Sequence, residues 1–294
     1  MKSIINFVLD PGQVVRYQNY TIKKLYWNIL KFFSPLENHK RKKAFSRLSA
    51  PKVLQYINPS HGASFQKANS VIALTENAVE ESWNIIKQSN LETTTNKSYL
   101  KPLLSKDEIK LPSAITNLAL SDELLSVVTK YLGTFPILYY INIWYTRGNA
   151  NQIEFEGSQL FHLDHEDYKQ IKCFVYLNDM EMDHGPTQYI NATDSHQIVK
   201  QFNYNTKTEN KNISDCKLNL YSKHVHLGKK GSIVLMDTSS CFHCGGRSKK
   251  DRFLLVFQYL TPFAFVRKSY KNKRLLHLLK NPEIKKSHKR MAIR

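Results

Sequence analysis

The sequence has few cysteines, no long hydrophobic run and no internal repeat, and each absence excludes a class of protein. Four cysteines in 294 residues do not suggest a disulfide scaffold. No run of eighteen apolar residues is present that could span a membrane. The apolar start at residues 1–7 is too short for a secretory signal and is soon interrupted by Asp10 and Pro11. We therefore expect a protein of the reducing cytoplasm.

A net charge of +19 is typical of nucleic-acid-binding proteins, but here the positive charge lies at the two ends of the chain. Residues 15–55 hold ten Lys/Arg and one acid, and residues 266–294 hold eleven Lys/Arg and one acid. The rest of the chain holds 22 residues of each sign. Because the middle is balanced, we expect no specific nucleic acid as a partner, and the overall charge says nothing about a substrate.

Both basic ends also carry apolar side chains. At residues 21–33 they recur at helical spacing with lysines opposite, and Pro35 stops this helix before a basic run at 40–43. The tail carries Leu275, Leu276, Leu278 and Leu279 among its cations. Amphipathic helices usually bury their apolar face, so we expect both stripes to pack on the core. The alternative is weak association with an anionic surface, such as a layer of phospholipid headgroups.

The pattern of the chain changes from helical to extended at Pro136. Before it, helices are expected at about 76–89 and from Ser121, which can cap the helix that Gly133 ends. After it, short runs rich in β-branched and aromatic residues lie at 137–145, 171–177, 187–190, 231–237 and 252–260. Helices followed by many short strands predict an α+β fold with a sandwich or barrel.

Residues 158–168, Ser-Gln-Leu-Phe-His-Leu-Asp-His-Glu-Asp-Tyr, are the most informative for chemistry. On an extended strand, residues two apart point to the same side, so His162 and Asp164 can meet one ion. An imidazole and a carboxylate suit iron(II) or manganese(II), whereas a structural zinc site prefers thiolates. One His-x-Asp pair is weak evidence, and a second copy, His165-Glu166-Asp167, follows at once.

A third ligand has to come from elsewhere in the fold. The best candidate is His243, which follows the apolar strand at 232–237. Two histidines and one carboxylate leave coordination positions open for a cosubstrate and oxygen. Cys241 and Cys244 flank His243, but no second Cys-x-x-Cys completes a tetrahedral zinc site. Asp237 is either a partner of the ligands or a turn residue at a strand end.

Further motifs follow the first His-x-Asp in a fixed order. They are Gln159 to Asp167, Tyr176 to Asp179, Gly185-Pro186, Ser195-His196, Asp237-Thr238, His243 to Gly246, and Arg252. In this order the region 139–262, about 40% of the chain, resembles the phytanoyl-CoA dioxygenase family of iron- and 2-oxoglutarate-dependent oxygenases. Two departures stand out: Ala192 to His196 replaces a usual Pro-Gly-Ser-His and is expected to reshape a loop, and Cys244 replaces a basic or small residue.

The resemblance implies a double-stranded β-helix, a cupin-like jelly-roll barrel of two facing sheets with the metal at its mouth. It implies that His162, Asp164 and His243 hold Fe(II), and that the second His-x-Asp supplies no ligand. Together with the charge distribution, this resemblance predicts three parts: a basic extension at 1–70 with an amphipathic helix, an oxygenase domain at 71–265 whose jelly roll lies mainly at 136–262, and a basic tail at 266–294.

The resemblance also implies 2-oxoglutarate as cosubstrate and O2 as oxidant. The distal carboxylate of 2-oxoglutarate would pair with Arg252, because a guanidinium can bind a carboxylate through two parallel hydrogen bonds. Tyr176 and Asn142 lie on strands where family members place further cosubstrate contacts. Arg247 is a rival for the carboxylate, but beside Lys249 and Lys250 a solvated charge is the expected reading.

The implied activity is that of a dioxygenase. Oxidative decarboxylation of 2-oxoglutarate to succinate and carbon dioxide is coupled to oxidation of a C–H bond in a small organic substrate. Related halogenases replace the iron-bound carboxylate with a small residue, so Asp164 implies hydroxylation rather than chlorination. Two alternatives belong to other classes of protein: a non-catalytic jelly roll that binds a metal or ligand, and a protein that binds polyanions or membrane surfaces through its basic ends.

Overall fold

Two antiparallel sheets form the centre of the computed structural model, which describes residues 11–92, 99–104, 113–204, 212–266 and 275–293. The large sheet has the strand order β1 (Ala63–Gln66), β7 (Ile233–Met236), β4 (Gln170–Tyr176), β9 (Arg252–Leu260), β3 (Ile137–Thr146) and β2 (Leu100–Pro102). The small sheet has the order β6 (His224–Val225), β5 (Gln188–Tyr189) and β8 (His243–Cys244). The predicted α+β class is confirmed, and within the described ranges hydrogen bonds do not close the two sheets into one barrel.

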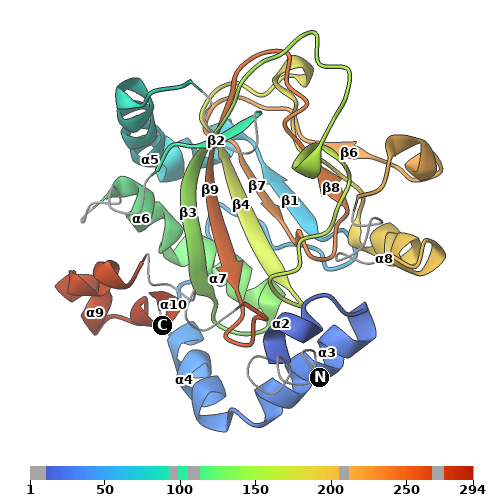
Figure 1. Cartoon of the computed structure of the whole chain (residues 1–294). Coiled ribbons are helices and arrows are strands. Elements are labelled where there is room, and N and C mark those ends of the chain that lie inside the picture. The colour runs from blue at the N-terminus through green and yellow to red at the C-terminus, as the bar shows by residue number, and fades with distance from the viewer. Residues whose placement is uncertain (1–10, 93–98, 105–112, 205–211, 267–274, 294) are drawn as a thin grey trace.

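Helices cover the outer face of the large sheet, on the side away from the small sheet (Figure 1). They are α5 (Ala68–Gln88), α6 (Ala114–Ala119) and α7 (Asp122–Leu132). Their apolar side chains join one buried cluster with alternate residues of the strands, such as Cys173 of β4 and Leu255 of β9. As expected, the Ser121 hydroxyl caps α7 by accepting from the amide of Leu124, and Gly133 ends it in the left-handed conformation.

The inner face of the large sheet carries the other alternate side chains, because successive residues of a strand point to opposite faces. On β4 these are Lys172, Phe174 and Tyr176. A second buried cluster fills the space between the sheets and includes Tyr176 and Leu254 of the large sheet with Tyr189 of the small one. The candidate site opens onto this inner face.

The outer face of the small sheet is covered by α8 (Ala192–Gln201), whose Ile198 is fully buried against Phe161 and Phe242. This helix corrects the expectation of a reshaped loop at residues 192–196. The Asn191 side chain accepts from the amide of Asp194 and so caps the helix, and an Asn at this place is the sequence signal of the helix start. Short 3-10 turns lie at η1 (Gly157–Gln159), η2 (Met182–His184) and η4 (Asp215–Leu218).

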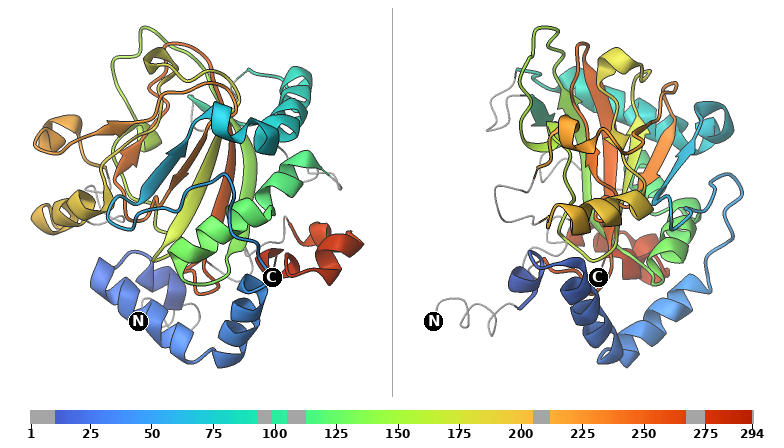
Figure 2. Two further views of the ribbon diagram at one scale, coloured as in Figure 1. Left: turned by 180° about the vertical axis from the view of Figure 1, so that it is seen from behind. Right: turned by 90° about the vertical axis from the view of Figure 1, so that its right-hand side faces the viewer.

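The two basic ends are built differently. The C-terminal segment contains η5 (Leu276–Lys280), α9 (Pro282–Lys286) and α10 (Arg290–Ile293). It buries Leu275, Leu278 and Ile293 in the same cluster as the large sheet, which confirms the packing expected of those two leucines, whereas Leu276 is 45% exposed. The residues at 267–274 lie outside the described ranges. At the other end, α2 (Pro11–Val15), α3 (Tyr20–Phe32) and α4 (Pro35–Phe45) extend beyond the strand ends (Figures 1 and 2).

Two details of the N-terminal part differ from the sequence pattern. Pro35 does end the helix at 20–32, but it also begins α4, because proline fits the first turn of a helix, where no amide hydrogen bond is lost. Residues 63–66, which lie before the expected start of the main domain at 71, form β1 and pair with β7 in the large sheet. No helix of the described residues is long and apolar enough to cross a membrane.

Candidate metal centre

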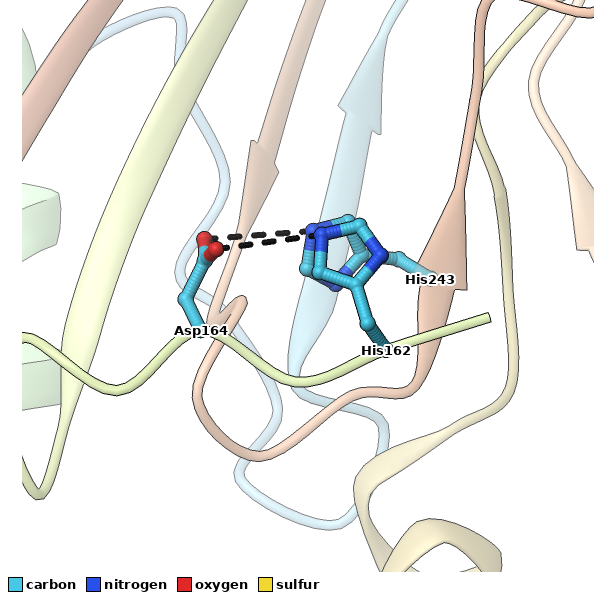
Figure 3. A group of neighbouring side chains, drawn as sticks. All are labelled: His162, Asp164 and His243. Atoms are coloured by element: carbon cyan, nitrogen blue, oxygen red, sulfur yellow. Dashed lines mark ion pairs between the residues drawn. The ribbon is translucent and has the colours of Figure 1, made fainter. Parts of the chain in front are cut away.

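The structure brings His162, Asp164 and His243 together from two separate parts of the chain. His162 and His243 form an isolated antiparallel bridge, with both backbone hydrogen bonds at 3.0 Å. The Nε2 atoms of His162 and His243 lie 3.9 and 3.8 Å from the two oxygens of Asp164 (Figure 3). One donor atom from each residue lies within 4.8 Å of the others, which is close enough for all three to contact one ion.

Backbone carbonyls orient both imidazole rings. The Nδ1 atom of His162 lies 2.8 Å from the carbonyl oxygen of Leu160, and that of His243 lies 3.0 Å from the carbonyl oxygen of Cys241. Each histidine thus donates to the carbonyl two residues before it, which leaves Nε2 as the lone-pair atom that faces Asp164. Burial, together with the neighbouring His162, lowers the pKa of His243 to about 3, so its Nε2 carries no proton at neutral pH.

Asp164 is ionised and paired with a lysine that the sequence pattern did not single out. The Nζ atom of Lys172 lies 2.6 Å from Oδ2 of Asp164. Burial opposes the charge of Asp164, but Lys172 and the two histidines outweigh it and hold the pKa of the carboxyl well below its usual range. Burial likewise opposes the charge of Lys172, and the carboxylates of Asp164 and Glu166 outweigh it and raise the pKa of the ammonium. The described site therefore contains a partly buried ion pair at one of its three candidate ligands.

The second His-x-Asp copy does not form a metal site. Asp167 is buried, and its carboxylate accepts hydrogen bonds from the amides of Tyr168 and Thr261 at 2.7 and 2.6 Å. His165 packs against the ring of Tyr17. Among the residues that the structure describes, the triad of His162, Asp164 and His243 is the one group with the spacing of a metal site. The choice between the two copies is therefore supported by their surroundings.

Arg252 is a buried guanidinium that has no acidic partner among the described residues. Its Nη1 donates to the carbonyl of Gly185 at 2.6 Å, while its Nε is buried without a hydrogen bond. The group lies against the turn after His243: a Cβ atom on Gly245 would be 3.1 Å from Nη1. Burial lowers the pKa of Arg252 to about 10, which leaves it charged at neutral pH. An unsatisfied buried cation is costly, and a carboxylate would relieve it.

Arg247, the rival of Arg252, is already engaged. Its Nη1 and Nη2 donate to both carboxylate oxygens of Asp215 at 3.1 and 2.7 Å, and its Nε donates to the carbonyl of Gln159. The guanidinium also lies over the rings of Phe155 and Phe161. The reading of Arg247 as a solvated charge is therefore wrong: it is a structural ion pair, and it leaves no free edge for a cosubstrate.

Tyr176 and Asn142 both lie on the inner face of the large sheet but are already hydrogen bonded. Tyr176 donates its hydroxyl to the carbonyl of His226 at 2.7 Å. The Asn142 amide forms a pair of hydrogen bonds with the backbone of Leu104. Of these two, Tyr176 lies near Arg252: burial raises the pKa of the Tyr176 hydroxyl, and the positive charge of Arg252 partly offsets that rise. The structure thus brings Tyr176 toward the guanidinium and uses Asn142 to hold the segment at residue 104.

Several residues of the motif set have structural roles. Asp237 is buried and accepts from the hydroxyl of Tyr131 at 2.9 Å and from the backbone of its own turn, so the interpretation as a turn residue applies. Ser195 accepts from the amide of Phe242 at 2.9 Å and so anchors the segment that carries His243. Gln159 donates to the carbonyl of Gly246 at 2.7 Å.

The cysteines around His243 do not form a second site. Cys241 belongs to the cluster between the sheets, whereas Cys244 belongs to the cluster under α8, so the two thiols lie on opposite faces. All four cysteines of the chain are free. Burial raises the pKa of the Cys244 thiol to about 12, which makes it a poor source of thiolate ligand. The zinc interpretation therefore finds no support in the geometry.

No family model matches the sequence, and no curated protein matches it. The chain is similar to a solved structure of the epimerase SnoN in complex with Fe3+, alpha ketoglutarate and nogalamycin RO, with a TM-score of 0.51, 11% identity, and coverage of 78% of this chain and 90% of SnoN. It also matches HygX from Streptomyces hygroscopicus with nickel, 2-oxoglutarate and hygromycin B bound, with a TM-score of 0.44, 16% identity, and coverage of 69% and 84%. At 11% identity, the likeness to SnoN shows a shared fold.

Proposed function

We propose that this chain is an Fe(II)- and 2-oxoglutarate-dependent dioxygenase that hydroxylates a small organic substrate and releases succinate and CO2. The observation that carries the proposal is the convergence of two Nε2 atoms and one carboxylate, each histidine fixed by a hydrogen bond from Nδ1. Two imidazole nitrogens and one carboxylate oxygen suit a divalent iron ion and leave coordination positions for other ligands. SnoN, which shares the fold, holds iron and alpha ketoglutarate.

The residues of the site fit both an iron ion and 2-oxoglutarate. His162, Asp164 and His243 would hold the metal, and Arg252 would bind the distal carboxylate of 2-oxoglutarate, whose charge would satisfy its unpartnered Nε. When bound, iron would activate O2, the oxidant, and 2-oxoglutarate would supply two of the four electrons that O2 takes up as it is oxidised to succinate and CO2. The protein's own part is to hold the histidines by their backbone carbonyls, to keep His243 unprotonated, and to exclude water through the apolar cluster between the sheets.

We also propose membership of the phytanoyl-CoA dioxygenase family, with the two sheets as the halves of a double-stranded β-helix. The motif order supports this, as do the contacts that Gln159 and Ser195 make with the segment around His243. The division into a basic N-terminal part, an oxygenase domain and a basic tail remains part of the proposal, with β1 counted in the domain because it pairs with β7. A cytoplasmic location is proposed from the four free cysteines.

The main alternative is a jelly roll that binds metal without turnover. Arg252 favours the enzyme, since a protein that binds only a cation has no use for a second buried cation near the site. The test is anaerobic reconstitution with Fe(II) and 2-oxoglutarate, followed by admission of O2 and measurement of succinate across a panel of small metabolites. Metal binding with no succinate from any member would support the alternative.

Ligand variants make the test specific. Replacing His162, Asp164 or His243 by Ala should abolish tight metal binding and succinate release. His165→Ala and Asp167→Ala are matched controls, because they alter the neighbouring His-x-Asp copy that lies outside the triad. The controls should keep the metal, although Asp167→Ala should lower thermal stability by removing two backbone hydrogen bonds. The reverse pattern would mean that the wrong copy has been chosen.

A further inference from the structure

Helix α3 and the start of α4 expose an apolar surface that the rest of the described chain does not cover. Six large apolar side chains form it, each between 41% and 78% exposed: Ile22, Leu25, Ile29, Phe32, Phe33 and Leu36. We call these six residues the α3–α4 apolar surface. The rings of Phe32 and Phe33 contact each other at 5.2 Å. Figures 1 and 2 show that α3 and α4 lie at one end of the molecule, beyond the ends of the sheet strands.

Packing on the core does not explain this surface, because α3 packs through a different side. That side carries Trp27, which is buried and donates its indole N–H to the hydroxyl of Thr261, and it includes the partly buried Leu30. At about 100° per residue, the members of the α3–α4 apolar surface that lie on α3 fall within a separate arc of roughly 100°. The helix therefore has two apolar faces, and only one is used inside the protein.

Positive charges predominate on the segment that carries this surface. Six exposed cations lie on α3, on α4 and just beyond: Lys24, Lys40, Lys42, Lys43, Arg47 and Lys52. The only acid between residues 15 and 55 is Glu37, and it is paired with the buried guanidinium of Arg41 at 2.6 Å. Carboxylates of α7 lie at the far end of this segment, because Asp122 accepts from the amide of Ser49 and Glu123 from the amide of Lys52. Within the described residues, Lys24, Lys40, Lys42 and Lys43 form no ion pair, so the surface combines protruding apolar side chains with an excess of positive charge.

We propose that the α3–α4 apolar surface docks on an anionic phospholipid membrane surface. Phe32, Phe33 and Leu36 are at least 76% exposed and lie where the chain turns from α3 into α4, so they protrude. A fluid lipid layer can accept protruding side chains without a preformed pocket, and anionic headgroups attract the flanking lysines. The described part of the C-terminal basic segment is the contrast: its Leu275 and Leu278 are buried in the protein, and Leu276, at 45%, is the large apolar side chain that it exposes.

The test is sedimentation of the full chain with vesicles of pure phosphatidylcholine and with vesicles containing phosphatidylglycerol, at low and high salt. We expect binding to the anionic vesicles that falls as salt rises, because exposed charges are screened. Phe32→Ser with Phe33→Ser and Leu36→Ser should weaken binding at least tenfold. Lys40→Gln with Lys42→Gln and Lys43→Gln should weaken it about a hundredfold at low salt, since each cation near an anionic surface contributes about fivefold.

Two matched controls separate this surface from general stickiness. Ile72→Ser with Ile153→Ser and Leu220→Ser removes three apolar side chains that are 56%, 91% and 91% exposed elsewhere. Lys285→Gln with Lys286→Gln and Arg290→Gln removes the same charge from the C-terminal segment, where all three residues are exposed. Both control variants should bind the anionic vesicles like the unaltered chain, and all variants should keep the same thermal unfolding temperature.

Three outcomes would overturn the proposal. The first is no binding to anionic vesicles at low salt. The second is an equal loss of binding in the control variants, which would make the attraction a property of the whole basic chain. The third is a concentration-dependent dimer in analytical ultracentrifugation that the Phe32, Phe33 and Leu36 variant dissolves, because the surface would then serve a second copy of the chain or, by the same logic, another protein.

Discussion

Lys172→Met should strengthen metal binding and weaken 2-oxoglutarate binding, and this pair of opposite effects tests the charge arrangement of the site. Lys172 lies on the inner face of β4, with its Nζ 2.6 Å from Oδ2 of Asp164. Methionine keeps much of the length of the side chain and removes the charge. Without the Lys172 ammonium, a divalent ion bound by Asp164 would no longer be repelled by it or compete with it for the carboxylate. The dianion 2-oxoglutarate would lose its electrostatic attraction to Lys172.

The magnitude follows from the short distance and the partial exposure. At an effective dielectric constant of 20, two unit charges 4 Å apart interact by about 4 kcal/mol. The Lys172 and Asp164 side chains are 23% and 13% exposed, so solvent and side-chain movement absorb part of that energy. We expect a net gain of roughly 1.4–2.7 kcal/mol, which is about tenfold to a hundredfold in metal affinity. For 2-oxoglutarate, a loss of about fivefold to tenfold is expected.

The assay is calorimetric titration with Mn2+, and then with 2-oxoglutarate in the presence of saturating Mn2+, without oxygen. Lys172→Arg is the matched control, because it keeps the positive charge, and it should resemble the unaltered protein in both titrations. If Lys172 served only to hold Asp164 in place, Lys172→Met would weaken metal and 2-oxoglutarate together. That result would refute the reasoning, and so would a variant that binds both ligands as before.

Three further predictions concern the neighbouring residues. Arg252→Leu should raise the apparent Michaelis constant for 2-oxoglutarate about tenfold or more. Arg247→Leu breaks a structural ion pair and should mainly lower the unfolding temperature. A larger effect of Arg247→Leu on that Michaelis constant would reverse the assignment. With Asp164 present, product formed in abundant chloride should gain oxygen and no chlorine by mass spectrometry. Asp237→Ala should lower the free energy of unfolding by about 2–3 kcal/mol in denaturant titration, because Tyr131 and several amides lose a buried acceptor.

The triad could be anticipated from the sequence by two different kinds of signal, one local and one based on the order of motifs. Residues two apart on an extended segment share a side, which sets His162 beside Asp164. His243 required the order of motifs, since only the fold brings residue 243 next to residue 162. The choice between two His-x-Asp copies also depended on that order. The structure supports it through Asp167, whose carboxylate accepts from backbone amides on two sides.

Lys172 was missed for a physical reason. Lys172 stands between apolar residues of its strand, at a position where the alternation of side chains predicts an inward-facing residue. The charge at that inward position is the one signal that the sequence offers. Sequence alone does not reveal that the residue eight positions earlier is close enough to pair with it. The same limit applies to Arg247: its partner Asp215 lies 32 residues away, so the turn composition around Arg247 suggested a solvated charge instead.

The basic ends illustrate what periodicity leaves open. The stripe at 21–33 and the leucines at 275–279 both look like faces meant for a core, and the same packing was expected of both. In the structure, the leucines at 275 and 278 join the main cluster, while most of the stripe at 22–33 stays exposed. The periodicity of apolar residues predicts that a helix has an apolar face, but it does not tell whether one packing partner can cover the full width of that face. The apolar residues of α3 form two faces that point in different directions, and the protein covers one of them.

The charges of the inner face favour a dianionic cosubstrate over a neutral ligand. Lys172 and Arg252 both lie on this face, and Arg252 is six residues along β9 from Gln258, the residue that pairs with Lys172. Between them, Asp164 supplies one negative charge. A divalent metal would raise the excess of positive charge on these groups to three, and burying such an excess is unfavourable. A ligand with two carboxylates would reduce it to one, with one carboxylate near the metal and the other at the unpartnered Nε of Arg252.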